Sequence, residues 1–110
     1  MTTVRLNNGT EIEAAVALYA EQFRLIHIYT DKLSMTQACE LFDNPENTAV
    51  ITVKRDDETR EVYKGYTELY SVQKGKALGG DGMILIWLQP PDVTPDQTQQ
   101  TMGKFLGHLQ

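Results

Sequence analysis

The sequence contains only one cysteine, Cys39, and only two histidines, His27 and His108, in 110 residues. A single cysteine cannot form an intramolecular disulfide, and it is compatible with a reducing compartment. A zinc site needs three or four convergent ligands, and the two histidines lie on different predicted elements without neighbouring cysteine or carboxylate ligands at a suitable spacing. We therefore expect no metal site and no cofactor.

Long apolar runs and clusters of basic residues are also missing. The longest apolar run, residues 83–88, is far too short to span a bilayer, and the opening MTTVRLNNGT lacks the apolar segment of a signal peptide. Ten Lys and Arg against 15 Asp and Glu give a net charge of −5, and the basic residues are scattered. Such a chain repels nucleic acid and anionic membranes, so we expect neither as a partner.

The overall composition is that of an ordinary globular protein, with 41% hydrophobic and 23% charged residues. The length matches one domain with a modest core. We predict an antiparallel β domain over residues 1–91, with a helix inserted at 34–42. We predict that residues 92–110 form a C-terminal helix appended to the same domain.

The first third of the chain predicts strands. Residues 4–16 alternate apolar and polar side chains around Asn8-Gly9, a pair that favours a tight hairpin turn because both positions need positive φ. A short helical segment over residues 14–20 is the alternative, since alanine and leucine favour helix. Residues 23–30 are apolar on both faces, which indicates a central strand covered on both sides.

A short helix follows at residues 34–42. Ser34 is a favourable N-cap, and Gln37 three residues later completes a capping box. The apolar stripe that would dock this helix on the sheet consists of Met35, Ala38, Leu41 and Phe42. The polar run 43–47, with Pro45, ends it.

Residues 48–54, 61–73 and 83–89 predict three further strands, and the charged stretch 55–60 is a hairpin loop between the first two. With the hairpin and the 23–30 strand, about six strands result. The expected fold class is α+β: a mainly antiparallel sheet, curled into a barrel or a sandwich, with one short packed helix and an amphipathic C-terminal helix.

Residues 73–82, QKGKALGGDG, suggest a phosphate-binding loop by their glycines and lysines. A P-loop requires Ser or Thr after its Gly-Lys pair and a glycine five residues before that pair. Here Ala77 follows Gly75-Lys76, and Tyr70 occupies the upstream position. The next element is a strand, not a helix whose N-terminus could hold phosphate. We predict a mobile connection between two strands.

The C-terminal helix begins with a Thr94 cap and Pro95 at its first position. Its apolar residues recur at i, i+3, i+4 and i+7: Met102, Phe105, Leu106 and Leu109. If this stripe packs on the chain's own sheet, it is structural. If the helix projects beyond Pro90-Pro91, the stripe is a contact for a protein partner or for a second copy. Both alternatives stay open at this point.

Two sets of residues have a chemical alternative to packing. An aromatic platform for a small ligand or carbohydrate would consist of Tyr63, Tyr66, Tyr70 and Trp87, although aromatic residues are favoured in sheets anyway. Under strict strand alternation, Tyr66 and Tyr70 share a face and Tyr63 lies on the other.

A small enzyme would use Cys39 as a nucleophile and His27 as its base, which requires hydrogen-bond reach between them. Cys39 is close to the apolar stripe of the short helix, so we expect it to be a buried structural thiol. We expect His27 to be a hydrogen-bonded core residue, and we predict no catalytic residue.

Three segments together resemble a known group of proteins. They are the VRLNNGTEIE hairpin, the TDKLSMTQACELFDNPENTAVITV strand–helix–strand, and VYKGYTELYSV followed by DGMILIWL. These are similar to small phage and prophage-encoded structural proteins of gut Firmicutes, of the tail or baseplate kind, over most of residues 3–89. The glycine-lysine loop and the C-terminal helix match no part of that group.

The resemblance implies small antiparallel barrels or sandwiches with one helix alongside. It also implies a non-enzymatic structural or interaction module, located in the cytoplasm or associated with a virion after assembly. We accordingly expect a protein partner or self-association. A small-ligand or carbohydrate-binding domain remains the alternative function.

Overall fold

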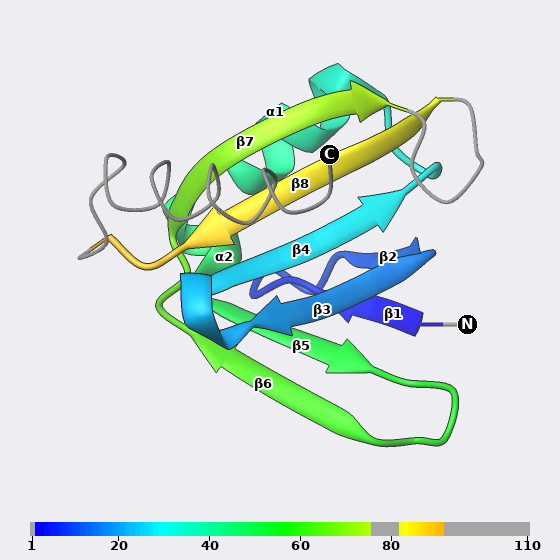
Figure 1. Ribbon diagram of the computed structural model, residues 1–110, viewed down its shortest axis with the longest axis vertical. Helices are drawn as coiled ribbons and strands as arrows, with labels where there is room; N and C mark the ends of the chain where they lie inside the picture. The colour runs from blue at the N-terminus through cyan, green and yellow to red at the C-terminus, as the bar shows by residue number, and fades with distance from the viewer. Residues whose placement is uncertain (1, 76–81, 92–110) are drawn as a thin grey trace.

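The computed structural model describes residues 2–75 and 82–91, which form two antiparallel sheets and three short helical segments (Figure 1). The α+β class and the antiparallel pairing are as predicted. The predicted barrel or sandwich takes the form of two four-stranded sheets that do not close into a barrel within the described residues.

Sheet A has the strand order β2-β1-β5-β6. Its strands are β1 Thr2–Arg5, β2 Glu11–Ala14, β5 Val50–Lys54 and β6 Arg60–Lys64. The β1–β2 hairpin turns at Asn8-Gly9, as predicted: Gly9 has φ +92°, and the Asn8 side chain accepts a hydrogen bond from the Thr10 N–H at 3.0 Å.

Sheet B has the strand order β3-β4-β8-β7. Its strands are β3 Val16–Ala20, β4 Leu25–Thr30, β7 Glu68–Gly75 and β8 Met83–Gln89. The chain passes from sheet A into sheet B at Ala15, whose N–H donates to the Tyr29 carbonyl at 2.8 Å. The predicted central position of the 23–30 strand is confirmed for β4, whereas Phe23 belongs to a short 3-10 helix, η1 Glu21–Phe23.

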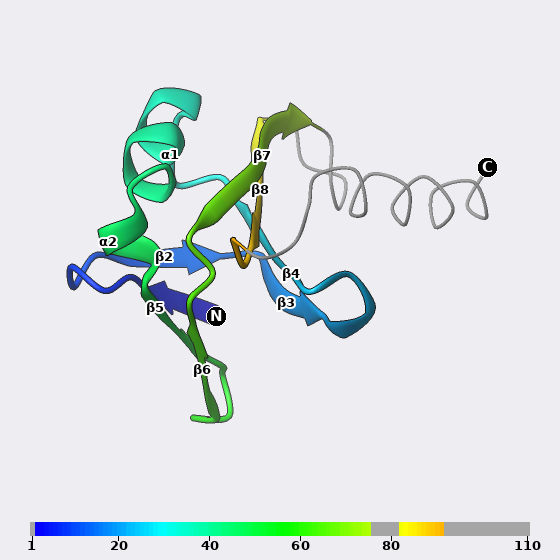
Figure 2. The same cartoon turned by 90° about the vertical axis from the view of Figure 1, so that its left-hand side faces the viewer.

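Two α-helical segments join β4 to β5: α1 Met35–Phe42 and α2 Pro45–Thr48. The predicted capping box is present, because Ser34 Oγ accepts from the Gln37 N–H at 3.1 Å and Gln37 Oε1 accepts from the Ser34 N–H at 3.0 Å. Figure 2 shows α1 and sheet A on the same side of sheet B. We call that side of sheet B its inner face.

The main core lies between the two sheets and α1. Ile28, Ile86 and Ile51 are fully buried there, and Phe42 of α1 closes the core with no exposed surface. Burying apolar area at about 25 cal/mol per Å² is what holds such short elements together. The core therefore accounts for the inner face of sheet B and leaves its opposite, outer face to be explained.

The predicted total of six strands is wrong, because the described residues contain eight. The predicted strand 61–73 is two strands, β6 and β7, which belong to different sheets. Gly65 lies between them with φ +84°, and its N–H donates to the Ala49 carbonyl at 3.0 Å. The alternative of a helix over 14–20 is also wrong, since that segment forms β3 and the end of β2.

Two predictions fall outside the described residues: most of the connection 73–82, at residues 76–81, and the C-terminal helix with its stripe Met102, Phe105, Leu106 and Leu109. Within residues 2–75 and 82–91, no helix is long and apolar enough to cross a membrane.

Candidate functional site

The outer face of sheet B carries a continuous apolar and aromatic surface. Strand register puts Leu18 beside His27 and His27 beside Trp87, and in the next row Tyr29 beside Leu85. We call this surface the outer face; around His27 it comprises Leu18, Leu25, Tyr29, Tyr70, Leu85 and Trp87. A sheet with one face on the core usually has a polar second face, so this surface needs an explanation.

A β-bulge in β7 adds a sixth large side chain to the outer face. The register between β7 and β8 shifts between Leu69 and Ser71, so Tyr70 is the extra residue. Its ring stacks on the indole of Trp87, with the ring centroids 6.0 Å apart and 10° between the planes. Without the shift, alternation would direct Tyr70 and Ser71 to opposite faces.

The outer face holds a second apolar cluster, separate from the main core. Leu25 is fully buried and Phe23 is 8% exposed, and they pack with Ala20, Tyr70 and Trp87. In the described part of the chain, this cluster draws only on β3, η1, β4, β7 and β8. Leu18 at its edge is 44% exposed, and Trp87 and Tyr70 are half-buried. The surface therefore offers apolar area for a further contact.

His27 lies in the middle of this face and is only 8% exposed. Its ring packs against Trp87 and Tyr29, at centroid distances of 5.3 and 6.4 Å. Burial lowers the pKa of the imidazole, because charging it would cost desolvation. The outer face is consequently uncharged at its centre near neutral pH.

Two nitrogen atoms on the outer face lack hydrogen-bond partners. They are Nε2 of His27 and Nε1 of Trp87, and both are buried and unpartnered within the described structure. His27 is thus buried as predicted, but at Nε2 it is not the hydrogen-bonded core residue that the sequence suggested. Buried polar atoms of this kind usually have partners, so they mark a place where a contacting segment can donate or accept.

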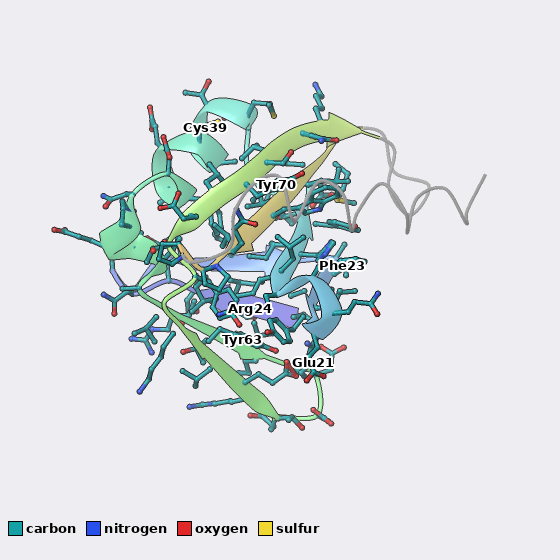
Figure 3. The ribbon with its side chains drawn as sticks, turned by 60° about the vertical axis from the view of Figure 1, so that its left-hand side comes forward. Glu21, Phe23, Arg24, Cys39, Tyr63 and Tyr70 are labelled. Atoms are coloured by element: carbon teal, nitrogen blue, oxygen red, sulfur yellow. The ribbon has the colours of Figure 1, made fainter. Side chains whose placement is uncertain are left out.

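The four residues of the predicted ligand platform do not lie together. Tyr63 and Tyr66 form a cluster with Tyr19 at the edges of β3 and β6, where the hydroxyl of Tyr66 donates to that of Tyr19 at 2.9 Å. Tyr70 and Trp87 belong to the outer face instead. Figure 3 labels Tyr63 and Tyr70 on these two separate parts of the molecule. The prediction that Tyr66 and Tyr70 share a face is therefore wrong, because Tyr66 lies between the end of β6 at Lys64 and the start of β7 at Glu68.

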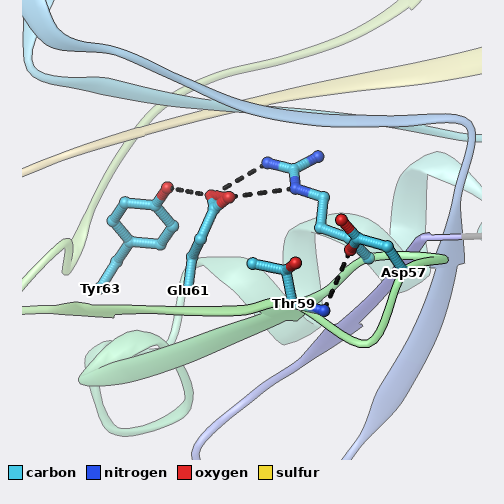
Figure 4. A network of polar contacts seen from close by, with 5 residues as sticks. Asp57, Thr59, Glu61 and Tyr63 are labelled. Atoms are coloured by element: carbon cyan, nitrogen blue, oxygen red, sulfur yellow. Dashed lines mark hydrogen bonds and ion pairs between the residues drawn. The ribbon is translucent and has the colours of Figure 1, made fainter.

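A polar network extends from Tyr63 toward the β5–β6 hairpin (Figure 4). Arg55 donates from Nε and Nη2 to the two carboxylate oxygens of Glu61, at 3.1 and 3.0 Å, and the Tyr63 hydroxyl donates to Glu61 Oε1 at 2.6 Å. Burial, with the Glu61 carboxylate, raises the pKa of Tyr63 to about 12. The hydrogen bonds from Arg55 and Tyr63 lower the pKa of Glu61.

An open hollow of about 430 Å³ lies beside this network and is lined by Thr2, Arg55, Asp56, Asp57, Thr59 and Glu61. Asp57 Oδ1 accepts from the Thr59 N–H at 3.0 Å, and hydrogen bonds to Thr59 lower its pKa. Glu61 is engaged by Arg55, so the groups around the hollow are occupied with holding the hairpin. We assign the hollow a structural role.

Cys39 and His27 lie on opposite sides of sheet B. Cys39 is exposed on α1, whose buried residues Ala38 and Phe42 pack into the core on the inner face (Figure 3). His27 contacts rings on the outer face. The sheet between them prevents the proton transfer that a cysteine nucleophile would need. The prediction that Cys39 is buried is wrong, because it lies one position off the stripe of a short helix.

The remaining described side chains bring no further chemistry together. Residues 2–75 and 82–91 contain no group of three or more His, Cys, Asp or Glu side chains placed to hold a metal ion. No family model matches the sequence, and no curated protein and no solved structure matches it either. The functional argument therefore starts from the surfaces of this molecule.

Proposed function

We propose that this protein is a non-enzymatic interaction module that joins a larger protein assembly through the outer face of sheet B. The carrying observation is that this face presents stacked and half-buried aromatic rings around an uncharged His27, on the side of the sheet away from the main core. Apolar patches bounded by polar residues are typical of protein contacts.

The chemistry of the outer face favours a protein partner over a small molecule. Aromatic residues are enriched at the centres of protein interfaces, where charged residues are depleted. The rings form a sheet surface, and small-molecule ligands usually bind in concave pockets. The candidate ligand platform of four rings is divided between two sites, so the alternative of a carbohydrate-binding domain retains only Tyr70 and Trp87.

On the resemblance to phage and prophage structural proteins, we propose that this assembly is a phage tail or baseplate. Tail and baseplate proteins of that kind combine small antiparallel β domains with a packed helix, an architecture similar to the two sheets and α1 described above. The assignment predicts that the coding sequence lies among genes for virion structural proteins. A location within an operon of metabolic enzymes would argue against it.

A matched pair of surface variants tests the interaction face. Leu18 on the outer face is 44% exposed, and Val62 on the opposite surface of sheet A is 55% exposed. Substitutions at such exposed positions usually change stability by no more than about 0.5 kcal/mol. Leu18→Glu and Val62→Glu therefore add the same charge to two different faces at little cost to the fold.

Tagged full-length protein and both variants are purified from the host cells, and co-purifying proteins are identified by mass spectrometry. We expect a partner that the wild type and Val62→Glu retain and Leu18→Glu loses, and that binds again when the purified components are mixed. Identical partner sets for the wild type and Leu18→Glu would overturn the proposal. Circular dichroism confirms that all three proteins are folded.

A further inference from the structure

We propose that residues 94–109 of the same chain cover the outer face of sheet B in the free protein, with their apolar stripe against it. The inference rests on the proposed function, because it states how the interaction face is regulated. A partner must then displace this segment to bind. The free protein thereby hides an aromatic surface that would otherwise favour aggregation.

The first argument is the position at which the described chain ends. β8 ends at Gln89 and carries Trp87 and Leu85 of the outer face, and the structure is described as far as Pro91. Residue 94 is therefore only a few residues along the chain from the outer face of sheet B. A tether this short gives a millimolar effective concentration, which a second copy or a dilute partner does not reach.

The second argument is a match in length. At about 1.5 Å per residue, a helix over 94–109 is about 24 Å long. At about 3.3 Å per residue, the seven residues of β8 extend over about 23 Å. The stripe from Met102 to Leu109 covers about 10 Å, which corresponds to two rows of outward side chains such as those of Leu85 and Trp87.

The third argument is chemical complementarity. The segment offers an apolar stripe to an apolar face and carries glutamine and threonine side chains next to it: Thr94, Thr98, Gln99 and Thr101. Amide and hydroxyl groups both donate and accept hydrogen bonds. They are suited to Nε2 of His27 and Nε1 of Trp87, the two buried nitrogens without partners in the described structure.

Trp87 is the only tryptophan in the sequence, so its fluorescence reports on the outer face alone. The full-length chain is compared with Phe105→Glu/Leu106→Glu, which puts two charges on the stripe. The control, Gln97→Glu/Gln100→Glu, puts two charges on the opposite side of the predicted helix. Acrylamide quenching and the emission maximum are measured over a range of protein concentrations.

We expect quenching to rise severalfold and emission to shift to the red in Phe105→Glu/Leu106→Glu, with no change in the control. A synthetic peptide of residues 92–110 should then restore the shielding, which requires that the face is still folded. Unchanged quenching in the stripe variant would overturn the inference. Shielding that increases with protein concentration, together with a dimer mass by light scattering, would assign the face to a second copy and also overturn it.

The quenching experiment needs no partner, so it separates this inference from the proposed function. If Leu18→Glu loses a partner but Trp87 is already accessible to acrylamide in the wild type, the outer face is an interaction site that residues 94–109 do not cover. If Trp87 is shielded in the wild type and Leu18→Glu loses no partner, residues 94–109 are a permanent part of the fold and the outer face is not an interaction site. If both proposals hold, Phe105→Glu/Leu106→Glu binds the partner more tightly than the wild type does.

Discussion

The ring of Tyr70 lies nearly parallel to the indole of Trp87, at a centroid distance of 6.0 Å. The two residues come from neighbouring strands, β7 and β8, and the bulge between Leu69 and Ser71 brings them together. The bulge leaves both Tyr70 and Ser71 on the side of Trp87, and the ring of Tyr70 stacks there. Tyr66 precedes β7 and contacts Tyr19 at the edge of the two sheets instead.

The stacked pair predicts an energetic coupling between Tyr70 and Trp87. Aromatic pairs contribute about 0.5–1.5 kcal/mol beyond the burial of their area. A double-mutant cycle of Tyr70→Leu and Trp87→Leu, followed by urea unfolding with circular dichroism, should give a coupling free energy in that range. As a control, Tyr63→Leu and Trp87→Leu should be additive, because Tyr63 belongs to the other ring cluster. Additivity in both cycles would contradict the stack.

Short sequence patterns predicted the parts of the fold that depend on neighbouring residues. The Asn8-Gly9 hairpin and the Ser34 capping box depend on residues within a few positions of each other, and both are present. The central position of β4 was readable because a strand buried on two faces is apolar at consecutive positions. Each of these features follows from a rule about neighbouring residues.

The outer face could not be predicted, because it depends on the pairing of strands that are far apart in the sequence, such as β4 and β8. Side chains alternate between the two faces of a sheet only along an uninterrupted strand. Here the strand pattern is interrupted at Gly65 and again by the bulge at Tyr70. The sequence around Tyr63, Tyr66 and Tyr70 therefore resembles one aromatic strand. The glycine at 65 was the available signal, since glycine inside a strand pattern often marks a break.

Gly65→Ala should destabilise the protein through backbone strain. Gly65 has φ +84°, and a Cβ built there meets no heavy atom within 4 Å, so no steric contact confuses the result. A left-handed conformation costs a residue with a side chain about 1–2 kcal/mol, and we expect that loss in the free energy of unfolding by urea.

Gly75→Ala is the matched control. Its added Cβ would lie 3.7 Å from Cδ1 of Leu85, an ordinary van der Waals contact, and its φ is outside the left-handed range. We expect a change of about 0.5 kcal/mol or less, in either direction. Equal losses in the free energy of unfolding for both variants would show that the left-handed conformation at residue 65 is not the cause of the loss.

Acidification should weaken the fold through His27. Burial lowers the folded-state pKa of this imidazole below 6.5, so the unfolded chain takes up the proton first as the pH falls. The contribution is fully present above the unfolded pKa and is lost as the pH falls toward the folded pKa. Urea unfolding at pH about 7.5 and about 5.5 should show a lower stability at the acidic pH.

His27→Gln tests whether His27 is responsible, because glutamine does not titrate. The variant should lose most of the difference between the two pH values, and NMR titration of the wild-type imidazole should give a pKa below 6.5. A pH dependence that is the same in His27→Gln would place its origin at another group.

Glu61→Gln should lower the pKa of Tyr63 from about 12 toward, but not to, its usual value of 10.0. Burial is the largest cause of the raised pKa and remains in the variant, whereas the hydrogen bond to a charged carboxylate and its electrostatic effect are removed. NMR titration of the tyrosine ring carbons above pH about 9 measures the change.

Asp57→Asn removes the same charge from the same hairpin, but Asp57 does not contribute to the raised pKa of Tyr63. Because the folded pKa is raised, stability from Tyr63 is present below pH 10 and is lost as the pH rises toward 12. Because its shift is smaller, Glu61→Gln should lose less stability than Asp57→Asn as the pH rises from 10 toward 12. An equal change of the Tyr63 pKa in both variants would show that general charge, and not the direct hydrogen bond, raises the pKa.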